Sequence, residues 1–119
     1  MVLYTASMLG YENMVRYLVE KGANIHKSNE VGNTPLFIAC HENNETIAKY
    51  LIEKGADINK EGSDGDTPLI LACENSNENL VKYLIEKGAD ICKENENGET
   101  PLYWACTINS EKIVEWLVE

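Results

Sequence analysis

The chain has 119 residues, of which 44% are hydrophobic, and its 20 acidic against 10 basic side chains give a formal charge of −10 at pH 7. This charge argues against a nucleic-acid partner, because affinity for the phosphate backbone comes from Lys and Arg. No apolar run approaches the roughly 20 residues that a membrane helix needs, and the N-terminus lacks the pattern of a signal peptide, so we expect a cytoplasmic protein without a membrane partner.

One short motif recurs along the chain at a step of 33 residues. The motif is Thr-Pro-Leu, which begins at Thr34, Thr67 and Thr100. A Gly two residues before it and a later Lys-Gly-Ala keep the same step. A fixed period of this size indicates a stacked repeat array. We therefore divide the single domain, residues 1–119, into the units 1–31, 32–64, 65–97 and 98–119, of which the first and last are incomplete.

Each Thr-Pro pair predicts the start of a short helix, because the Thr hydroxyl can accept a free backbone amide and Pro has no amide to satisfy. Apolar residues follow, such as Leu36, Ile38 and Ala39 in the second unit. Turn-prone residues then end the helix, and these are Gly10, Asn43-Asn44, Ser76-Asn77 and Asn109-Ser110. We expect a left-handed backbone at this reversal, since Gly and Asn tolerate it better than other residues.

A second helix is predicted after each reversal. It opens with Glu45, Glu78 or Glu111, where a negative charge favours the helix N-terminus. An apolar stripe at helical spacing indicates one buried face. The stripe consists of Ile47, Ala48, Leu51, Ile52, Leu80, Val81, Leu84, Ile85, Ile113, Val114, Leu117 and Val118. Lys54-Gly55 and Lys87-Gly88 end the helix, with a cation on the last turn and a glycine at the left-handed cap.

Three of the four cysteines share one position in successive repeats, at Cys40, Cys73 and Cys106. Each follows an Ala in a helical slot that we expect to be buried. Packed helices lie about 8–10 Å apart, whereas a disulfide needs Cα atoms within about 7 Å, so neighbours in this series cannot easily bridge. We predict that they are small core hydrophobes in a reducing compartment, and that the loop residue Cys92 is the thiol to check for exposure.

Together these motifs resemble the ankyrin repeat over the whole chain. The third unit carries them at Gly65, Thr67, Pro68, Leu69, Ala72, Gly88, Ala89 and Asp90. The resemblance implies an all-α solenoid of stacked antiparallel helix pairs, with hairpin loops that project from one edge. It also implies a non-enzymatic protein–protein interaction scaffold, which would be one segment of a longer ankyrin-repeat protein.

The chain departs from the family pattern at two sets of positions. The His that usually follows Thr-Pro-Leu is replaced by Phe37, Ile70 and Tyr103. We expect apolar contacts there in place of the hydrogen bonds of that His. Asn59 matches a frequent loop Asn of the family, but its equivalents are His26 and Cys92, which predicts less uniform hydrogen bonding among the hairpins.

The last unit is apolar, although a terminal repeat needs a polar outer face. Its apolar residues are Trp104, Ile113, Trp116 and Leu117. We therefore expect either a longer array or an end that another domain or subunit covers. We expect a monomer, with this end as the surface for any end-to-end association.

No motif indicates catalysis or a metal site. The string that begins at Asp57 resembles a calcium loop, but its twelfth position, which needs a bidentate Glu, is Pro68. His41-Glu42 begins like a zinc-protease helix, but Glu45 stands where the second His should be. No Ser-His-Asp or Cys-His pairing can be argued, so we expect no cofactor, no metal and no enzyme activity.

What remains is a binding surface. In ankyrin proteins the partner usually meets the hairpin tips and the exposed side of the first helix, and the units of this chain differ from one another at those positions. Carried over by position, the hairpin set is Glu30, Val31, Asn33, Ser63, Asp64, Asp66, Glu96, Asn97 and Glu99. The first-helix set, on the concave face, is Met8, His41, Glu42, Glu74, Asn75, Thr107 and Ile108. Such variation fits a grafted binding site, although solvent exposure alone also permits it.

The many carboxylates in these sets predict a negative field, so we expect another protein with a basic surface as the partner. The acidity would also keep a small domain in solution without any such partner. Two alternative functions stay open. The chain could be the targeting or regulatory module of a larger enzyme whose catalytic domain lies outside these residues, or a purely structural array without a ligand.

Overall fold

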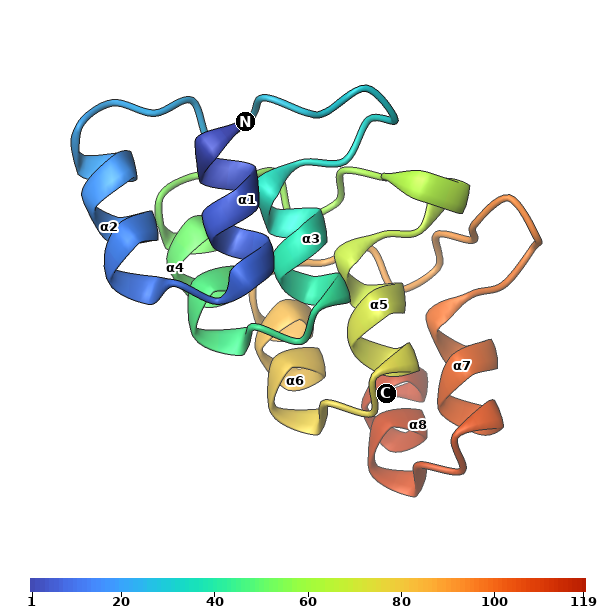
Figure 1. Ribbon diagram of the computed structural model, residues 1–119. Coiled ribbons are helices and arrows are strands. Elements are labelled where there is room, and N and C mark those ends of the chain that lie inside the picture. The colour runs from blue at the N-terminus through green and yellow to red at the C-terminus, as the bar shows by residue number, and fades with distance from the viewer.

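A computed structural model describes all residues 1–119 and shows four antiparallel helix pairs in a stack (Figure 1). The first helices of the pairs are α1 (Val2–Leu9), α3 (Pro35–His41), α5 (Pro68–Glu74) and α7 (Pro101–Thr107). The second helices are α2 (Glu12–Glu20), α4 (Glu45–Glu53), α6 (Glu78–Glu86) and α8 (Glu111–Val118). A short 3₁₀ turn, η1 (Ser63–Gly65), lies between α4 and α5. The predicted all-α solenoid is confirmed.

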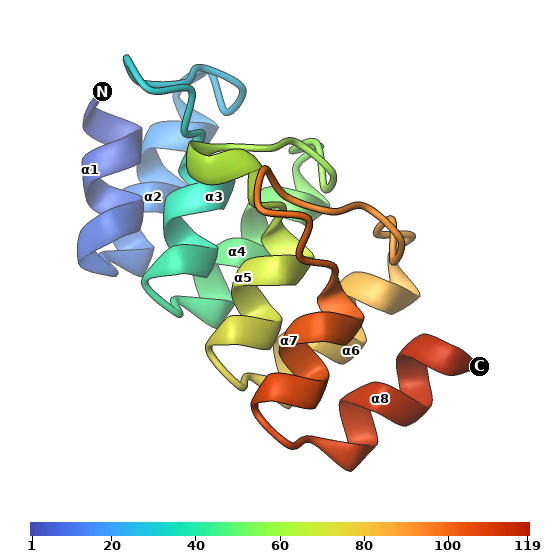
Figure 2. The same ribbon diagram turned by 90° about the vertical axis from the view of Figure 1, so that its right-hand side faces the viewer.

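The helices form two layers. Helices α1, α3, α5 and α7 pack against one another in chain order, and α2, α4, α6 and α8 form the second layer in the same way. The loops that join successive pairs all project from the same end of the stack (Figure 2). The whole measures 40 × 25 × 21 Å. None of the helices combines the length and the apolarity that crossing a membrane would take.

The Thr-Pro pairs start helices as predicted. The Thr34 hydroxyl accepts a hydrogen bond from the Phe37 amide at 3.2 Å, and Thr67 and Thr100 cap α5 and α7 in the same way. Helix α1, whose equivalent positions lack Thr-Pro, has no side-chain cap. The side chain of a capping Thr satisfies an amide that would otherwise lack a partner, which is why these helices begin at the same place in each unit.

The reversals and the helix ends also have the predicted backbone. Gly10, Asn43, Ser76 and Asn109 have φ angles of 80°, 61°, 58° and 59°. These left-handed residues turn the chain from the first helix of a pair into the second. After the second helix, Gly55 and Gly88 have φ angles of 99° and 93°, where a side chain would be strained.

The core runs along the stack between the two layers. Leu51, Leu80 and Leu84 are completely buried, and so are the cysteines Cys40 and Cys73. The leucines belong to the predicted apolar stripe of the second helices, and the cysteines occupy the equivalent position in the first helices α3 and α5. Because each inner unit is covered on two sides, the same position is buried in successive units.

Three predictions fail in the last unit. Cys106 and Val118 are exposed, although both occupy positions that were expected to be buried. Tyr103 is 49% exposed, whereas its equivalents Phe37 and Ile70 are buried, and Phe37 packs in the apolar core as expected. The physical reason is that no further unit packs beyond α7 and α8. Ile113 and Leu117, by contrast, are buried, because they face the preceding unit.

Each long loop contains a hairpin-like turn closed by one backbone bond. Asn29 donates to the Asn33 carbonyl, Gly62 to that of Asp66, and Asn95 to that of Glu99, at distances of 2.9, 3.0 and 2.9 Å. The side chain of Asn59 accepts a hydrogen bond from the Asp90 amide at 2.8 Å. No equivalent bond joins the other loops at this position, which agrees with the expected lack of uniformity.

Candidate functional site

The tip of the second loop rests on the third loop. The Glu96 amide donates to the Asp64 carbonyl at 2.9 Å. Asp64 has a left-handed φ of 62° and Gly65 follows with 73°. A Cβ on Gly65 would lie 2.9 Å from the Glu96 nitrogen, so only glycine permits this contact. The two loops therefore hold one another in position.

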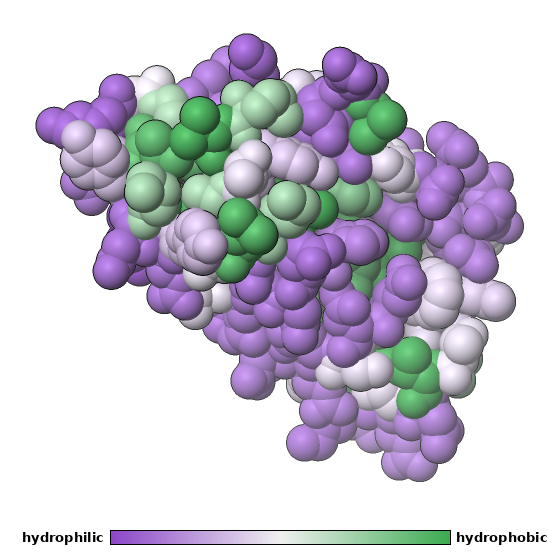
Figure 3. Space-filling view, in the orientation of Figure 1, coloured by the Kyte–Doolittle hydropathy of each residue, from purple (hydrophilic) through white to green (hydrophobic).

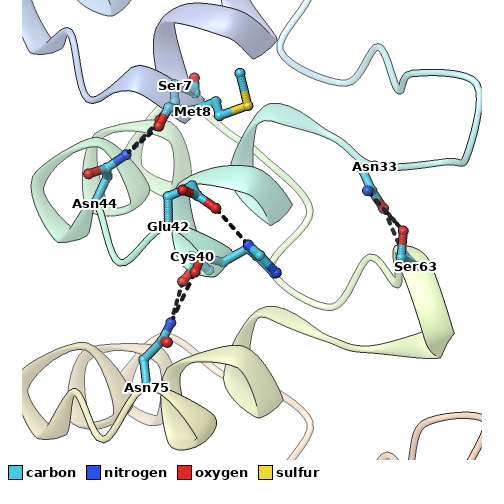
Figure 4. A network of polar contacts seen from close by, with 9 residues as sticks. Ser7, Met8, Asn33, Cys40, Glu42, Asn44, Ser63 and Asn75 are labelled. Atoms are coloured by element: carbon cyan, nitrogen blue, oxygen red, sulfur yellow. Dashed lines mark hydrogen bonds and ion pairs between the residues drawn. The ribbon is translucent and has the colours of Figure 1, made fainter.

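The first and second loops are joined by one side chain. Asn33 is 7% exposed, and its Nδ2 donates to the Ser63 hydroxyl at 3.0 Å while its Oδ1 accepts from the Ser63 amide at 2.7 Å (Figure 4). Gly62 packs beside this pair, because a Cβ there would overlap both Asn33 and Phe37. Asn33 was predicted as a partner contact, but its buried amide serves the contact between loops.

Asn95 has the corresponding role between the second and third loops. Its Nδ2 donates to Asp66 at 2.9 Å and to Glu99 at 2.8 Å. Its Oδ1 accepts from the amides of Asn97 and Glu99, both at 2.9 Å. This buried amide fixes two carboxylates beside one another, although like charges repel.

Five carboxylates gather on the loops and on α5, and we call them the acidic surface: Asp64, Asp66, Glu74, Glu96 and Glu99. Partial burial raises the pKa of Asp66, and the charges of Asp64 and Glu99 raise it further, against the opposing effects of the Asn95 hydrogen bond and of His41. Partial burial also raises the pKa of Glu74, assisted by the charges of Asp66 and Glu99. Asp66 and Glu74 therefore lie in the negative field of neighbouring carboxylates.

No Lys or Arg of the chain forms an ion pair with the acidic surface. The two ion pairs with lysine join Lys49 to Glu45 at 2.8 Å and Lys93 to Glu61 at 2.7 Å, and both lie elsewhere. The basic side chain that acts on the pKa of Asp66 and of Glu74 is His41, whose Nδ1 lies 2.8 Å from Glu42 and whose ring stacks on Phe37. The negative charge of the surface is thus left without a strong internal counter-charge.

Two asparagines join neighbouring helix ends beside this surface. Asn75 donates to the carbonyls of Cys40 and His41 at 2.9 and 3.3 Å, and Asn44 donates to those of Ser7 and Met8 at 2.8 and 3.3 Å (Figure 4). Each bond satisfies a carbonyl at the end of a first helix that has no partner within the helix. Asn75 was predicted as a partner contact, and its amide is already engaged in this way.

The structure places the remaining predicted residues as follows. Ten are exposed, namely Glu30, Val31, Met8, His41, Glu42, Asp64, Glu74, Glu96, Asn97 and Thr107. Four are half-buried, namely Ser63, Asp66, Glu99 and Ile108. The second and third loops and α5 bring the acidic members together, whereas Glu30 and Val31 lie on the first loop. Val31 is 66% exposed, and its amide donates a hydrogen bond to Asn29. No hydrogen bond joins Val31 to the acidic residues.

Sequence reasoning missed Asn44 and Asn95. Asn95 has a counterpart at Asn29, 66 residues earlier, whose Oδ1 accepts from the amides of Val31 and Asn33. The signal that could have identified Asn95 is this recurrence of Asn two repeat lengths apart, with Gly62 at the equivalent position between them. Asn44 has no such recurrence in the first unit, where Tyr11 takes its place.

The arrangement offers little chemistry beyond binding. No group of three or more His, Cys, Asp or Glu side chains could hold a metal ion. Burial raises the pKa of the Cys40 and Cys73 thiols to about 12, which opposes formation of the nucleophilic thiolate. The acidic surface is instead suited to cationic groups, whose charge would offset its repulsion.

Comparison with known proteins identifies one family. The family model described as ankyrin repeats (3 copies) matches residues 1–62 and 59–119, which together span the chain. A search of curated proteins finds no match.

Proposed function

The chain belongs to the ankyrin-repeat family, and on this basis we propose that it is a non-enzymatic scaffold that binds a basic segment of another protein on its acidic surface. Ankyrin repeats are generally protein–protein interaction modules. The proposed contact consists of the tips of the second and third loops and the end of α5 that carries Glu74.

The observation that carries this proposal is the gathering of carboxylates on the second and third loops and α5, with no Lys or Arg of the chain in an ion pair with them. The raised pKa of Asp66 and of Glu74 agrees with it. A carboxylate whose pKa is raised by burial and by neighbouring carboxylates is less stable in its charged form than the same group in water. A Lys or Arg side chain from a partner would reverse part of that effect. The free energy that the folded chain loses through repulsion would then be recovered on binding.

The positions of the carboxylates also support the proposal. Asn95 holds the carboxylates of Asp66 and Glu99 in place before any partner arrives. The backbone bond between Glu96 and Asp64 fixes the two loops that carry the other loop carboxylates. A preorganised surface loses less conformational entropy on binding than a flexible one. Charges at such a surface mainly raise the association rate and select partners of opposite charge.

The test is to capture partners from the native source with the wild-type chain and with a triple variant, Asp64→Lys, Glu74→Lys and Glu96→Lys. These three residues are exposed and their side chains make no hydrogen bond within the chain, so the variant should fold. A protein captured by the wild type is then expressed, and its Kd is measured by calorimetry over a range of salt concentrations. We expect the triple variant to bind at least about tenfold more weakly, and the wild type to weaken as salt rises.

The matched control is Glu20→Lys, Glu53→Lys and Glu86→Lys. These residues share one position at the ends of the second helices and are exposed, so the control has the same net charge as the first variant. We expect it to keep most of the affinity. If both variants lost the same affinity, the loss would come from the net charge and not from the acidic surface. An affinity that changed neither with salt nor in either variant would contradict the proposal.

A further inference from the structure

Two side-chain contacts join the second loop to the third. The Asn59 side chain accepts a hydrogen bond from the Asp90 amide at 2.8 Å, and the Glu61 carboxylate pairs with the Lys93 ammonium at 2.7 Å. The pKa of Lys93 is raised, chiefly by this bond to Glu61. In both contacts the second loop supplies the acceptor and the third loop supplies the donor.

Both acceptors are missing one repeat earlier, in the first loop. His26 stands at the position of Asn59, and Ser28 stands at the position of Glu61. A neutral imidazole always keeps one N–H donor, and a hydroxyl has no charge. The first loop therefore presents neither the amide oxygen nor the carboxylate that the second loop presents.

The donors on the other side of this contact are kept. In the second loop, Asp57 is equivalent to Asp90 and Lys60 is equivalent to Lys93. The Asp57 amide donates no hydrogen bond within the chain, and the Lys60 ammonium forms no ion pair. Two donors that have acceptors between the second and third loops are thus free between the first and second.

A cavity of about 240 Å³ lies between the first two loops at this place. It is lined by Ile25, His26, Thr34, Ala56, Asp57 and Lys60. This volume is several times the roughly 30 Å³ of one water molecule, so an ion of several atoms fits. On the face in Figure 3, hydrophilic side chains cover most of the projecting loops, whereas apolar side chains gather at the end that holds α1. A ligand between the loops is therefore bound by charge and hydrogen bonds.

One carboxylate also lines the cavity, but it is engaged within its own loop. Oδ1 of Asp57 accepts a hydrogen bond from the Asn59 amide at 2.9 Å. The Asp90 carboxylate makes the equivalent bond in the third loop, and a negative group still reaches the lysine there, because Glu61 pairs with Lys93. The aspartate at this position is thus compatible with an anion beside the lysine.

We propose that the cavity between the first two loops binds a phosphate group. One phosphate oxygen accepts from the Asp57 amide and a second pairs with Lys60, which replaces the two acceptors that the first loop lacks. The N–H of the His26 ring is a third donor, from the opposite side of the cavity, and phosphate has an oxygen for each. Hydrogen bonds between such donors and an anion are stronger than bonds between neutral groups.

The bound phosphate would join the first loop to the second, as Asn59 and Glu61 join the second loop to the third. The site shares no residue with the acidic surface, so this binding is separate from the proposed scaffold function.

The test is a titration of the isotope-labelled chain with inorganic phosphate, followed by NMR of the backbone amides. Sodium chloride keeps the ionic strength constant. We expect the Asp57 amide signal to shift and to saturate, since this amide gains an acceptor. The Asp90 amide is the internal control, because it already donates to Asn59 and should stay in place. The proposal is wrong if neither signal moves or if both move equally.

A double variant, His26→Asn with Ser28→Glu, supplies the two missing acceptors from the chain itself. We expect it to bind phosphate at least about tenfold more weakly, because its own side chains occupy the Asp57 amide and Lys60. Thr46→Glu is the matched control, since Thr46 is exposed and the substitution changes the net charge by the same amount. An equal loss in this control, or an undiminished affinity in the double variant, would overturn the proposal.

A further variant and a further probe define the ligand. Lys60→Met keeps an unbranched side chain but removes the ammonium, and we expect phosphate to bind about threefold or more weakly; an unchanged affinity would contradict the site. Methyl phosphate is then titrated against the wild type. If it shifts the Asp57 amide as inorganic phosphate does, the site accepts a phosphate group carried by a larger molecule. If only inorganic phosphate does so, the ligand is the free ion. Circular dichroism confirms that each variant is folded.

Discussion

The Nδ2 atom of Asn95 lies 2.9 Å from Oδ1 of Asp66, and this hydrogen bond joins the loops of two successive units. The same amide nitrogen also binds Glu99 at 2.8 Å, and the Asn95 oxygen accepts two backbone amides. One buried side chain therefore organises the third loop and anchors it to the second.

Replacing Asn95 with Ala should lower the free energy of unfolding by about 1–3 kcal/mol, because four hydrogen bonds are lost and buried polar groups are left unpaired. Urea unfolding followed by circular dichroism measures the change. Asn97→Ala is the control, since Asn97 is exposed and only its backbone takes part in the loop. If the two variants were equally stable, Asn95 would not organise the loop.

Leu84→Ala should cost about 2–5 kcal/mol, the usual range for a buried Leu in a close-packed core. Leu84 is 0% exposed and lies in α6, where units on both sides cover it. Val118→Ala is the matched control in the last helix. Val118 is 64% exposed, so its replacement should change stability by less than about 0.5 kcal/mol. A Leu84→Ala chain as stable as the wild type would contradict the packing of the stack.

Tyr50→Phe should leave stability unchanged or raise it by about 1 kcal/mol. The Tyr50 hydroxyl is buried and has no hydrogen-bond partner, and removing an unsatisfied polar group removes its desolvation cost. The ring and its contact with Arg16 remain. Thermal unfolding would detect the difference, and a clear loss of stability would show that the hydroxyl has a partner in solution.

Asp66→Asn should stabilise the chain at neutral pH, and this gain should shrink as the pH falls. The pKa of Asp66 is raised in the folded state, so the folded chain holds this proton more tightly than the unfolded chain. The stabilising contribution of the protonated group is complete below the unfolded pKa and is lost as the pH rises through the folded pKa. Asn resembles the protonated carboxyl and can still accept from Asn95.

This pH dependence is measured by urea unfolding of the wild type and Asp66→Asn at a series of pH values between about 4 and 7. Comparing the two chains cancels the titration of all groups away from position 66. A gain that grew as the pH fell would mean that the pKa of Asp66 is lowered by folding, which is the opposite sign. It would also remove one observation that agrees with the proposed basic partner.

Two of the four thiols should react with a disulfide reagent in the folded chain. Cys92 and Cys106 are exposed, whereas Cys40 and Cys73 are buried and have a pKa raised to about 12, so their thiolate is scarce and shielded. All four should react once urea unfolds the chain. Rapid reaction of a single thiol would place Cys106 in the core, as its sequence position suggests.

The helices themselves could be predicted because their causes are local. A Thr followed by Pro caps a helix wherever it occurs, and a Gly after Lys ends one, so Thr67 and Gly88 mark boundaries without reference to the rest of the chain. The apolar stripe of α6 indicates its buried face for the same reason. The period of 33 residues then extends each local result to the neighbouring units.

The candidate site was predictable only in part. Positions such as Asp64 and Glu74 follow from the repeat register, and the structure places both among the exposed carboxylates. The roles of Asn33 and Asn95 could not be predicted, because each depends on a partner about 30 residues away that is brought close by stacking. Their side-chain amides join neighbouring loops, but the repeat pattern does not specify which residue stands at these positions.

The sequence by itself therefore determined the repeat, the helix boundaries and the side of each helix that is buried, since these depend on residues within one turn or one period. Only the tertiary structure decided where residues at equivalent positions of the repeat differ in burial or in their contacts. Cys106 is exposed while Cys73 is buried, and Tyr17 lacks the cation that Tyr50 has, although each pair has the same place in the repeat. The physical reason is that burial and cation–π contact depend on the neighbouring unit, and units at the two ends have only one.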